Sequence, residues 1–222
     1  MKKAEAIIAW SSGKDSAWAL HEVRQSGEFD IVAALTTVTR GFNRVSMHGM
    51  RTELLLAQIQ ASGLTPLLVE IPWPCTNAAY EAAMNAQITE SKNKGVTHII
   101  FGDLFLQDIR AYRERQLHGT GITPVFPLWM RETRDLARGM LTAGVEAYLT
   151  TVDLKKLPAR FAGRRFEDAL LAELGESDPC GENGEFHTFV FDGPLFSSPV
   201  PFRIGDAVLR DNFWFRDLIP EE

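Results

Sequence analysis

The sequence contains little cysteine. Among its 222 residues the cysteines are Cys75 and Cys180, and neither lies in a CxxC pair. This excludes a disulfide framework and a cysteine-rich zinc site, and it favours a reducing, cytoplasmic setting. A chain of this length buries about 70% of its unfolded surface, so it needs no disulfides to hold a core.

An excess of positive charge and long apolar runs are also missing. Lys and Arg total 23 against 29 Asp and Glu, giving a net charge of -6, so the chain has no overall electrostatic attraction to nucleic acid. It has no uncharged apolar stretch of about 18 residues, and we therefore predict no membrane-spanning helix. The apolar run at residues 6–10 is too short for the core of a signal peptide. We interpret this run as the first β-strand.

Strand and helix patterns alternate over the first 130 residues. Between short apolar runs, apolar residues recur at helical spacing, and Gly63 and Gly95 are placed to end two of these helices. The apolar runs that predict buried strands are residues 6–10, 31–38, 66–71 and 98–101. Because these strands are apolar throughout, we expect an α/β fold with a doubly wound parallel sheet covered on both faces.

The pattern changes near two prolines, Pro124 and Pro127. One more helix and strand follow, and then a loop-rich β segment. We therefore predict two domains, a sheet domain over residues 1–128 and a smaller C-terminal α+β domain over residues 129–222. The aromatic run 213–215 near the C-terminus is predicted to lie in the core, and a homodimer interface is the alternative.

The loop SSGKDS follows the first predicted strand and opens a helix. Its small residues allow the backbone N–H groups to point inward, and the helix N-terminus adds about half a positive charge. Lys14 adds a full charge, and the serines add hydroxyl donors. The loop is not a Walker A motif, because Ile8 and Asp15 occupy positions where that motif needs Gly and Ser or Thr. We predict a phosphate site formed by Ser11, Ser12, Gly13, Lys14, Asp15 and Ser16. A simple N-capping turn is the alternative.

Gly102 and Asp103 follow the fourth predicted strand. If the strand order is 3-2-1-4-5, this strand lies beside the first, and both residues face the same crevice as the loop 11–16. Asp103 could then bind Mg2+, a ribose hydroxyl or an adenine amine. The alternative is that Asp103 caps a helix over residues 104–117.

Basic residues gather near the same edge of the predicted sheet. Arg110, Arg113 and Arg115 lie within two helical turns, and arginine binds phosphates and carboxylates in a bidentate manner. A solvated helix face is the alternative for any one of them. His48 and Arg51, after the second strand, are weaker candidates.

The segment DPCGENGEFHT, residues 178–188, is a second dense cluster of functional groups. It combines a thiol, carboxylates, an amide and an imidazole with two glycines, which permit unusual backbone angles. One Cys and one His are too few soft ligands for zinc. Two other interpretations stay open: Cys180 could be a nucleophile that forms a thioester, or the segment could be an ordinary polar turn without a function. The candidate catalytic residues here are Glu182, Asn183, Glu185 and His187.

Taken together, these stretches resemble a known family. SSGKDS resembles the PP-loop of the ATP pyrophosphatases, with Ser12 in place of the usual second Gly, a change that we expect to be tolerated at negative φ. With GDLFLQDIRAYRE, PVFPLW and DPCGENGEFHTFVFDGPLF, the chain from about residue 5 to residue 200 is similar to the diphthine–ammonia ligase (diphthamide synthase) family, in its short, bacterial-type form. The resemblance implies an adenine-nucleotide-binding sheet domain of the HUP type and a smaller substrate domain carrying CGENGEFHT.

The resemblance also implies an activity. Family members use ATP with Mg2+ to adenylate a carboxylate, release pyrophosphate and form an amide with ammonia, so Lys14 and Asp15 would act on the phosphates, while Glu182, Asn183, Glu185 and His187 would orient the acceptor or move protons. The metal-binding residues stay unassigned. One alternative is an adenine-nucleotide-binding regulator without turnover, which would leave CGENGEFHT unused. A tRNA-thiolating enzyme is a poorer alternative, because the chain is acidic and its cysteines are isolated.

Overall fold

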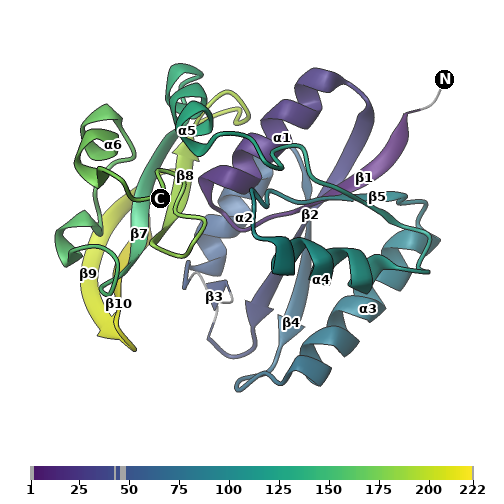
Figure 1. Cartoon of the computed structure of the whole chain (residues 1–222). Coiled ribbons are helices and arrows are strands. Elements are labelled where there is room, and N and C mark those ends of the chain that lie inside the picture. Colours follow the sequence, from purple (N-terminus) through teal and green to yellow (C-terminus); the bar gives the residue numbers. More distant parts are fainter. Residues whose placement is uncertain (1–2, 43, 46–48, 222) are drawn as a thin grey trace.

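The computed structural model describes residues 3–42, 44–45 and 49–221, so His48 lies outside the described residues. Within them, two sheets lie side by side (Figure 1). Sheet A contains β1 (Ala4–Ala9), β2 (Phe29–Thr39), β3 (Arg44–Val45), β4 (Thr65–Ile71), β5 (His98–Ile100) and β6 (Thr123–Val125). Sheet B contains β7 (Glu146–Asp153), β8 (Phe186–Asp192), β9 (Phe202–Arg210) and β10 (Phe213–Pro220).

Sheet A has the doubly wound arrangement that the sequence predicts. Its parallel strands run in the order β4-β2-β1-β5-β6, which is the order 3-2-1-4-5, and the short β3 pairs with β2 in the antiparallel direction. In β1, Ile7 packs into one apolar cluster while Ala6 and Ile8 pack into another, because successive side chains of a strand point to opposite faces. Burial on both faces explains why the strand is apolar throughout.

Helices cover both faces of sheet A. One face carries α1 (Lys14–Ser26) and α2 (Thr52–Ala61), and the other carries α3 (Asn77–Asn93) and α4 (Gln107–Leu117). The two predicted stops are confirmed, because Gly63 and Gly95 follow α2 and α3 with φ of 71° and 96°. None of the described helices is long and apolar enough to cross a membrane.

The alternative that Asp103 caps a helix is wrong. The helix begins at Gln107, with Leu106 at the cap position, so Asp103 does not cap it. Residues between β5 and α4 instead form a connection without regular secondary structure, with a bend at Phe105. Asp103 is therefore left available for contacts at the carboxyl end of β5.

Sheet B is antiparallel, with strand order β8-β7-β10-β9. The remaining helices are α5 (Thr133–Thr142), the 3-10 turn Ala159–Phe161 and α6 (Asp168–Leu174). Trp214 in β10 packs against the larger apolar cluster, in line with the predicted core position. The division of the chain at residue 128 stays a prediction; β6 ends at Val125 and β7 begins at Glu146.

A buried glutamine joins the two sheets. Gln58 of α2 is fully buried, and its amide nitrogen donates hydrogen bonds to the carbonyls of Ser12 and Val190. Its amide oxygen accepts from the indole N–H of Trp10 at 3.2 Å. Because Ser12 follows β1 and Val190 lies in β8, this side chain holds the loop 11–16 against sheet B.

Candidate active site

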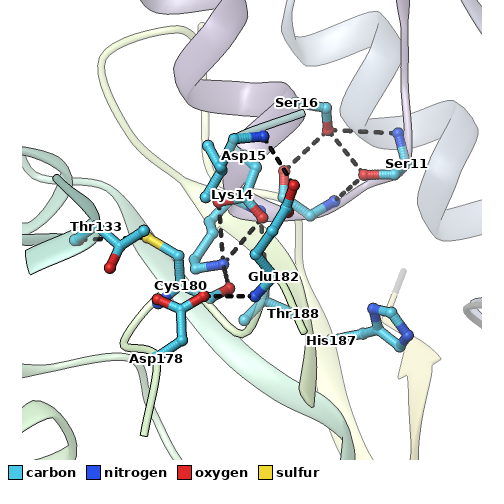
Figure 2. Close-up of polar contacts among 12 residues, drawn as sticks. Ser11, Lys14, Asp15, Ser16, Thr133, Asp178, Cys180, Glu182, His187 and Thr188 are labelled. Carbon is cyan, nitrogen blue, oxygen red and sulfur yellow. Dashed lines mark hydrogen bonds and ion pairs between the residues drawn. The ribbon is translucent and has the colours of Figure 1, made fainter. Parts of the chain in front are cut away.

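The loop 11–16 turns at the carboxyl end of β1 and leads into α1 (Figure 2). The hydroxyl of Ser11 lies 3.1 Å from that of Ser16, and it accepts the N–H of Gly13 at 3.3 Å. Ser16 donates its hydroxyl to the carbonyl of Gly13 at 2.9 Å. These internal bonds hold a tight turn whose helix N-terminus faces a cavity, as a phosphate-binding loop requires.

Ser12 adopts a backbone conformation opposite to the one that we predicted. Its φ is 66°, in the left-handed region that favours glycine, whereas we expected a negative φ. The Cβ of a non-glycine residue costs about 1–2 kcal/mol in this region. Two hydrogen bonds to its carbonyl, from the Val190 N–H at 3.0 Å and from Gln58 at 3.0 Å, compensate for this cost and fix the loop.

Lys14 is buried inside the site rather than extended into the open cavity. Only 1% of Lys14 is exposed. Its ammonium donates hydrogen bonds to both carboxylate oxygens of Asp15, at 3.1 and 2.9 Å, and to the carbonyl of Cys180. Burial alone would lower the pKa of Lys14, but the attraction of Asp15, with smaller effects from Cys180 and Asp178, raises that pKa above its ordinary value. The amine therefore stays protonated at neutral pH.

The segment 178–188 is shaped by Asp178, which we had not assigned a role. One carboxylate oxygen accepts the N–H of Cys180 at 3.1 Å, and the other accepts the N–H of Glu182 at 2.8 Å. Gly181 has a φ of 70°, and a Cβ there would lie 2.9 Å from the carbonyl oxygen of Phe186. The predicted need for glycine in this segment is confirmed at this position.

Thr188 is a second residue whose role we missed. Its hydroxyl accepts the backbone N–H of Lys14 at 3.0 Å, so β8 contacts the first turn of α1 directly. Both Asp178 and Thr188 belong to the segment that the sequence singles out. Asp178 bonds backbone N–H groups close by in the sequence, as Asp often does in turns. The partner of Thr188 lies far away in the sequence, and no local pattern indicates it.

The four predicted catalytic residues of this segment do not all face the cavity. Glu182 and His187 line it, but the His187 imidazole points away from the Lys14 cluster (Figure 2). The Asn183 amide donates to Glu185 at 3.3 Å, and neither residue lines the cavity. The structure thus brings Glu182 close to Lys14 and Asp15, whereas Asn183 and Glu185 are not part of the cavity wall.

Cys180 lies in surroundings that do not activate a thiol. It is 1% exposed, and its thiol lies 3.4 Å from the carbonyl of Thr133. Burial raises the pKa of the Cys180 thiol, an effect that outweighs the opposing attraction of Lys14. Because the thiolate is the nucleophilic form, this geometry argues against a thioester at Cys180.

Glu182 connects the segment 178–188 to sheet A. Its carboxylate accepts the N–H of Leu104, just after β5, at 2.8 Å. Burial raises the pKa of Glu182 from 4.5 to about 7, while the Leu104 hydrogen bond partly opposes this and Asp15 and Asp103 add to it. A carboxyl group that titrates near neutrality inside a cleft is suited to proton transfer.

This pKa predicts how stability depends on pH. Because the folded pKa of Glu182 lies above the unfolded one, the folded state holds the proton more tightly, so the free energy of unfolding should fall as pH rises from 4.5 through about 7. Glu182→Gln keeps an acceptor for the Leu104 N–H and removes the titration. We expect the variant to lose this part of the pH dependence, as measured by urea unfolding at a series of pH values from below 4.5 to above 7. An unchanged slope would contradict the shifted pKa.

These groups surround a cavity of about 630 Å³. Its walls come from the loop 11–16, the ends of β2, β4 and β5, the start of α3, α4 and the segment 178–188. Gly102 packs against the loop so closely that a Cβ would lie 2.8 Å from the Asp15 backbone, and Asp103 lines the cavity beside it. The volume falls within the range of about 300–1,000 Å³ typical of small-molecule sites.

The three predicted arginines of α4 separate in the structure. Arg113 lines the cavity, 3.7 Å from the carboxylate of Asp103. The guanidinium of Arg110 lies over Phe126 and Trp129, at 4.8 and 4.7 Å from the ring centroids. Arg115 is exposed and not part of the cavity wall. Arg51 pairs instead with Asp217 of β10 at 2.6 Å. In the part of the chain that the structure describes, no group of three or more His, Cys, Asp or Glu residues is arranged to hold a metal ion.

Comparison with known proteins bears on the C-terminal part of the chain. Residues 132–217 match the diphthamide synthase C-terminal domain, and this range includes the segment 178–188. Diphthine–ammonia ligases of Rattus norvegicus and Homo sapiens are each 32% identical over 95 residues, 40% of this chain and 36% of the relative. That of Danio rerio is 30% identical over 97 residues, 41% of this chain and 38% of the relative. The aligned part therefore spans little more than a third of the length of these relatives. The chain is thus similar to the diphthine–ammonia ligases in part, and the family match spans residues 132–217 of its 222 residues.

Proposed function

We propose that this protein is an ATP-dependent, AMP-forming ligase. It would adenylate a carboxylate, release pyrophosphate and form an amide with ammonia. The observation that carries the proposal is the enclosure of one cavity by the loop 11–16 and the segment 178–188, with contacts between them at Lys14 and Thr188. The activity named for the relatives, diphthine–ammonia ligase, supports the ligase class.

The chemistry follows from the weakness of a carboxylate as an electrophile. A carboxylate oxygen of the acceptor attacks the α-phosphorus of ATP, and pyrophosphate leaves with the electrons of the broken P–O bond. Ammonia then attacks the acyl carbon, and AMP leaves. We propose that the loop 11–16 stabilises the departing pyrophosphate, because fixed donors of this kind are each worth about 2.7–4 kcal/mol.

The other residues have narrower proposed roles. Lys14 supplies positive charge beneath the loop, and Glu182 takes up the proton that the attacking ammonia loses, since its pKa of about 7 is suited to that transfer. The Asp15 side chain is 27% exposed and lines the cavity, so its carboxylate could bind Mg2+ that arrives with ATP. Magnesium commonly uses one or two carboxylates together with phosphates, and when bound it would neutralise phosphate charge.

The products of ATP turnover test this proposal. Incubation with ATP, Mg2+, ammonium and a panel of carboxylate metabolites should yield AMP and pyrophosphate in equal amounts, measured by chromatography and a coupled pyrophosphate assay. Formation of ADP and phosphate would contradict it. Nucleotide binding without turnover across the whole panel would favour the regulatory alternative.

A further inference from the structure

One part of the cavity wall carries an acidic and a basic side chain side by side. Asp103 follows β5, and Arg113 lies on the cavity side of α4. The Nε atom of Arg113 lies 3.7 Å from the Oδ2 atom of Asp103, which is close enough for an ion pair and too far for a hydrogen bond. Their side chains are 25% and 19% exposed, so a ligand in the cavity can reach both.

Both groups have unused hydrogen-bonding capacity. Within the described residues, Asp103 Oδ2 and Arg113 Nε are buried without a hydrogen-bond partner, and so is the amide nitrogen of Gln116, one turn further along α4. Burial raises the pKa of Asp103, and Arg113 opposes that rise. Native proteins leave few buried polar groups unpaired. Two of these atoms, Arg113 Nε and Asp103 Oδ2, face each other, and the partly exposed remainder of both side chains lines the cavity, where a bound molecule can complete the bonding of this stretch.

The arrangement of charges restricts the class of that molecule. A simple carboxylate would pair with Arg113 and face the negative charge of Asp103, and a simple amine would have the reverse conflict. A ligand fits best when its own cation and anion are neighbours, because the ammonium can then lie at Asp103 and the carboxylate at Arg113 and Gln116. In a free amino acid the α-ammonium and the α-carboxylate are neighbours of this kind, because both are attached to the same carbon atom.

The surroundings of the ion pair are apolar. The Arg113 guanidinium lies over the Phe101 ring, 5.0 Å from its centroid. Phe101 belongs to the same apolar cluster as Met84 and Ile88 of α3 and Leu117 of α4, all of which line the cavity. In Figure 1, α3 and α4 run next to each other on one face of sheet A. A side chain that extends from the ion pair along this wall would meet apolar atoms.

We propose that the wall formed by Asp103, Arg113 and Gln116 binds a free α-amino acid with an apolar side chain. That the bound amino acid is the acceptor whose carboxylate is adenylated rests on the proposed function. That the amino acid binds here does not. The proposal assigns Asp103 to the acceptor instead of to the nucleotide. It also places part of the acceptor site on sheet A, whereas the sequence had assigned acceptor binding to residues 129–222.

Titration calorimetry with L-leucine, L-methionine and L-phenylalanine tests the binding directly. At least one should bind, and for leucine two analogues separate the contributions of the charges. 3-Methylbutylamine lacks the carboxylate, and 4-methylpentanoate lacks the ammonium. Each should bind at least about tenfold more weakly, because each leaves one buried charge of the wall unpaired. Binding of none of the three amino acids, or equal binding of leucine and its analogues, would overturn the proposal.

Variants locate the site. Arg113→Gln and Asp103→Asn should each weaken amino-acid binding at least about tenfold, whereas Arg115→Gln, on the exposed side of the same helix, should leave it unchanged. Cooperative urea unfolding of the two cavity variants, like that of the unchanged protein, would show that they are folded. If amino acids bind as expected but no AMP forms with them, the proposed function fails and the subsite stands. If AMP forms with other carboxylates while Arg113→Gln binds leucine normally, the proposed amino-acid subsite is wrong and the proposed function stands.

Discussion

Lys14→Met should reduce AMP formation about 100-fold or more and also destabilise the fold. The loss of activity follows from removing the positive charge beneath the phosphate-binding loop, where a single fixed donor contributes a factor of about 10²–10³. The loss of stability follows because burial raises the pKa of Asp15, and the variant removes the ammonium, 2.9 Å away, that offsets the cost of burying this carboxylate. Breaking a buried pair from one side costs about 3–5 kcal/mol. We expect the lower end, since the Asp15 side chain is 27% exposed.

A double variant separates these two effects. In Lys14→Met/Asp15→Asn no unpaired charge remains, so most of the free energy of unfolding should return, while AMP formation should stay low. Urea unfolding and a coupled pyrophosphate assay measure the two quantities on the same samples. If the double variant regained activity together with stability, Lys14 would have only a structural role. If Lys14→Met alone kept full activity, the proposed role of the loop would be wrong.

The fold was predictable from the sequence because its signals are local. Continuous apolar runs predict strands buried on both faces, and Gly63 and Gly95 end helices where their positive φ is needed. The strand order follows from the same alternation, since successive βα units wind outward from β1. By contrast, the alternative that a helix starts next to Asp103 is wrong: the helix begins at Gln107, and the N–H of Leu104 is bound by the distant Glu182 carboxylate.

The details of the site depend on partners that are distant in sequence. The φ of Ser12 is set by hydrogen bonds from Val190 and Gln58, which no reading of residues 11–16 could anticipate. The position of the Lys14 ammonium is set by the Cys180 carbonyl. The composition of residues 178–188 predicts a shaped polar loop, but it does not tell which side chains face the cavity. Glu182 does, with its carboxylate bound to the Leu104 N–H, whereas the Asn183 amide donates to Glu185 and neither of these two residues lines the cavity.

Gly102→Ala should displace the phosphate-binding loop and reduce ATP binding and AMP formation. The added Cβ would lie 2.8 Å from the carbonyl carbon and oxygen of Asp15 and 2.9 Å from the Ser16 nitrogen. All three are backbone atoms of the first turn of α1, so no flexible side chain can move aside. Either α1 or the end of β5 must shift. Overpacking of this kind costs about 1–3 kcal/mol, and a displacement of about 1 Å at a catalytic site can cost 10²-fold in rate.

Gly139→Ala is the matched control for this substitution. Gly139 lies within α5, where a Cβ would meet only the Trp18 ring at 3.6 Å, an ordinary contact. Alanine in a helix interior is more stable than glycine by about 0.5–1 kcal/mol, so this variant should unfold at equal or higher urea and keep full ATP binding. Both variants add the same methyl group to a glycine. They differ only in the atoms that this methyl group contacts. Calorimetry with ATP distinguishes them: equal ATP affinity in the two variants would mean that the close packing of Gly102 on Asp15 does not position the loop.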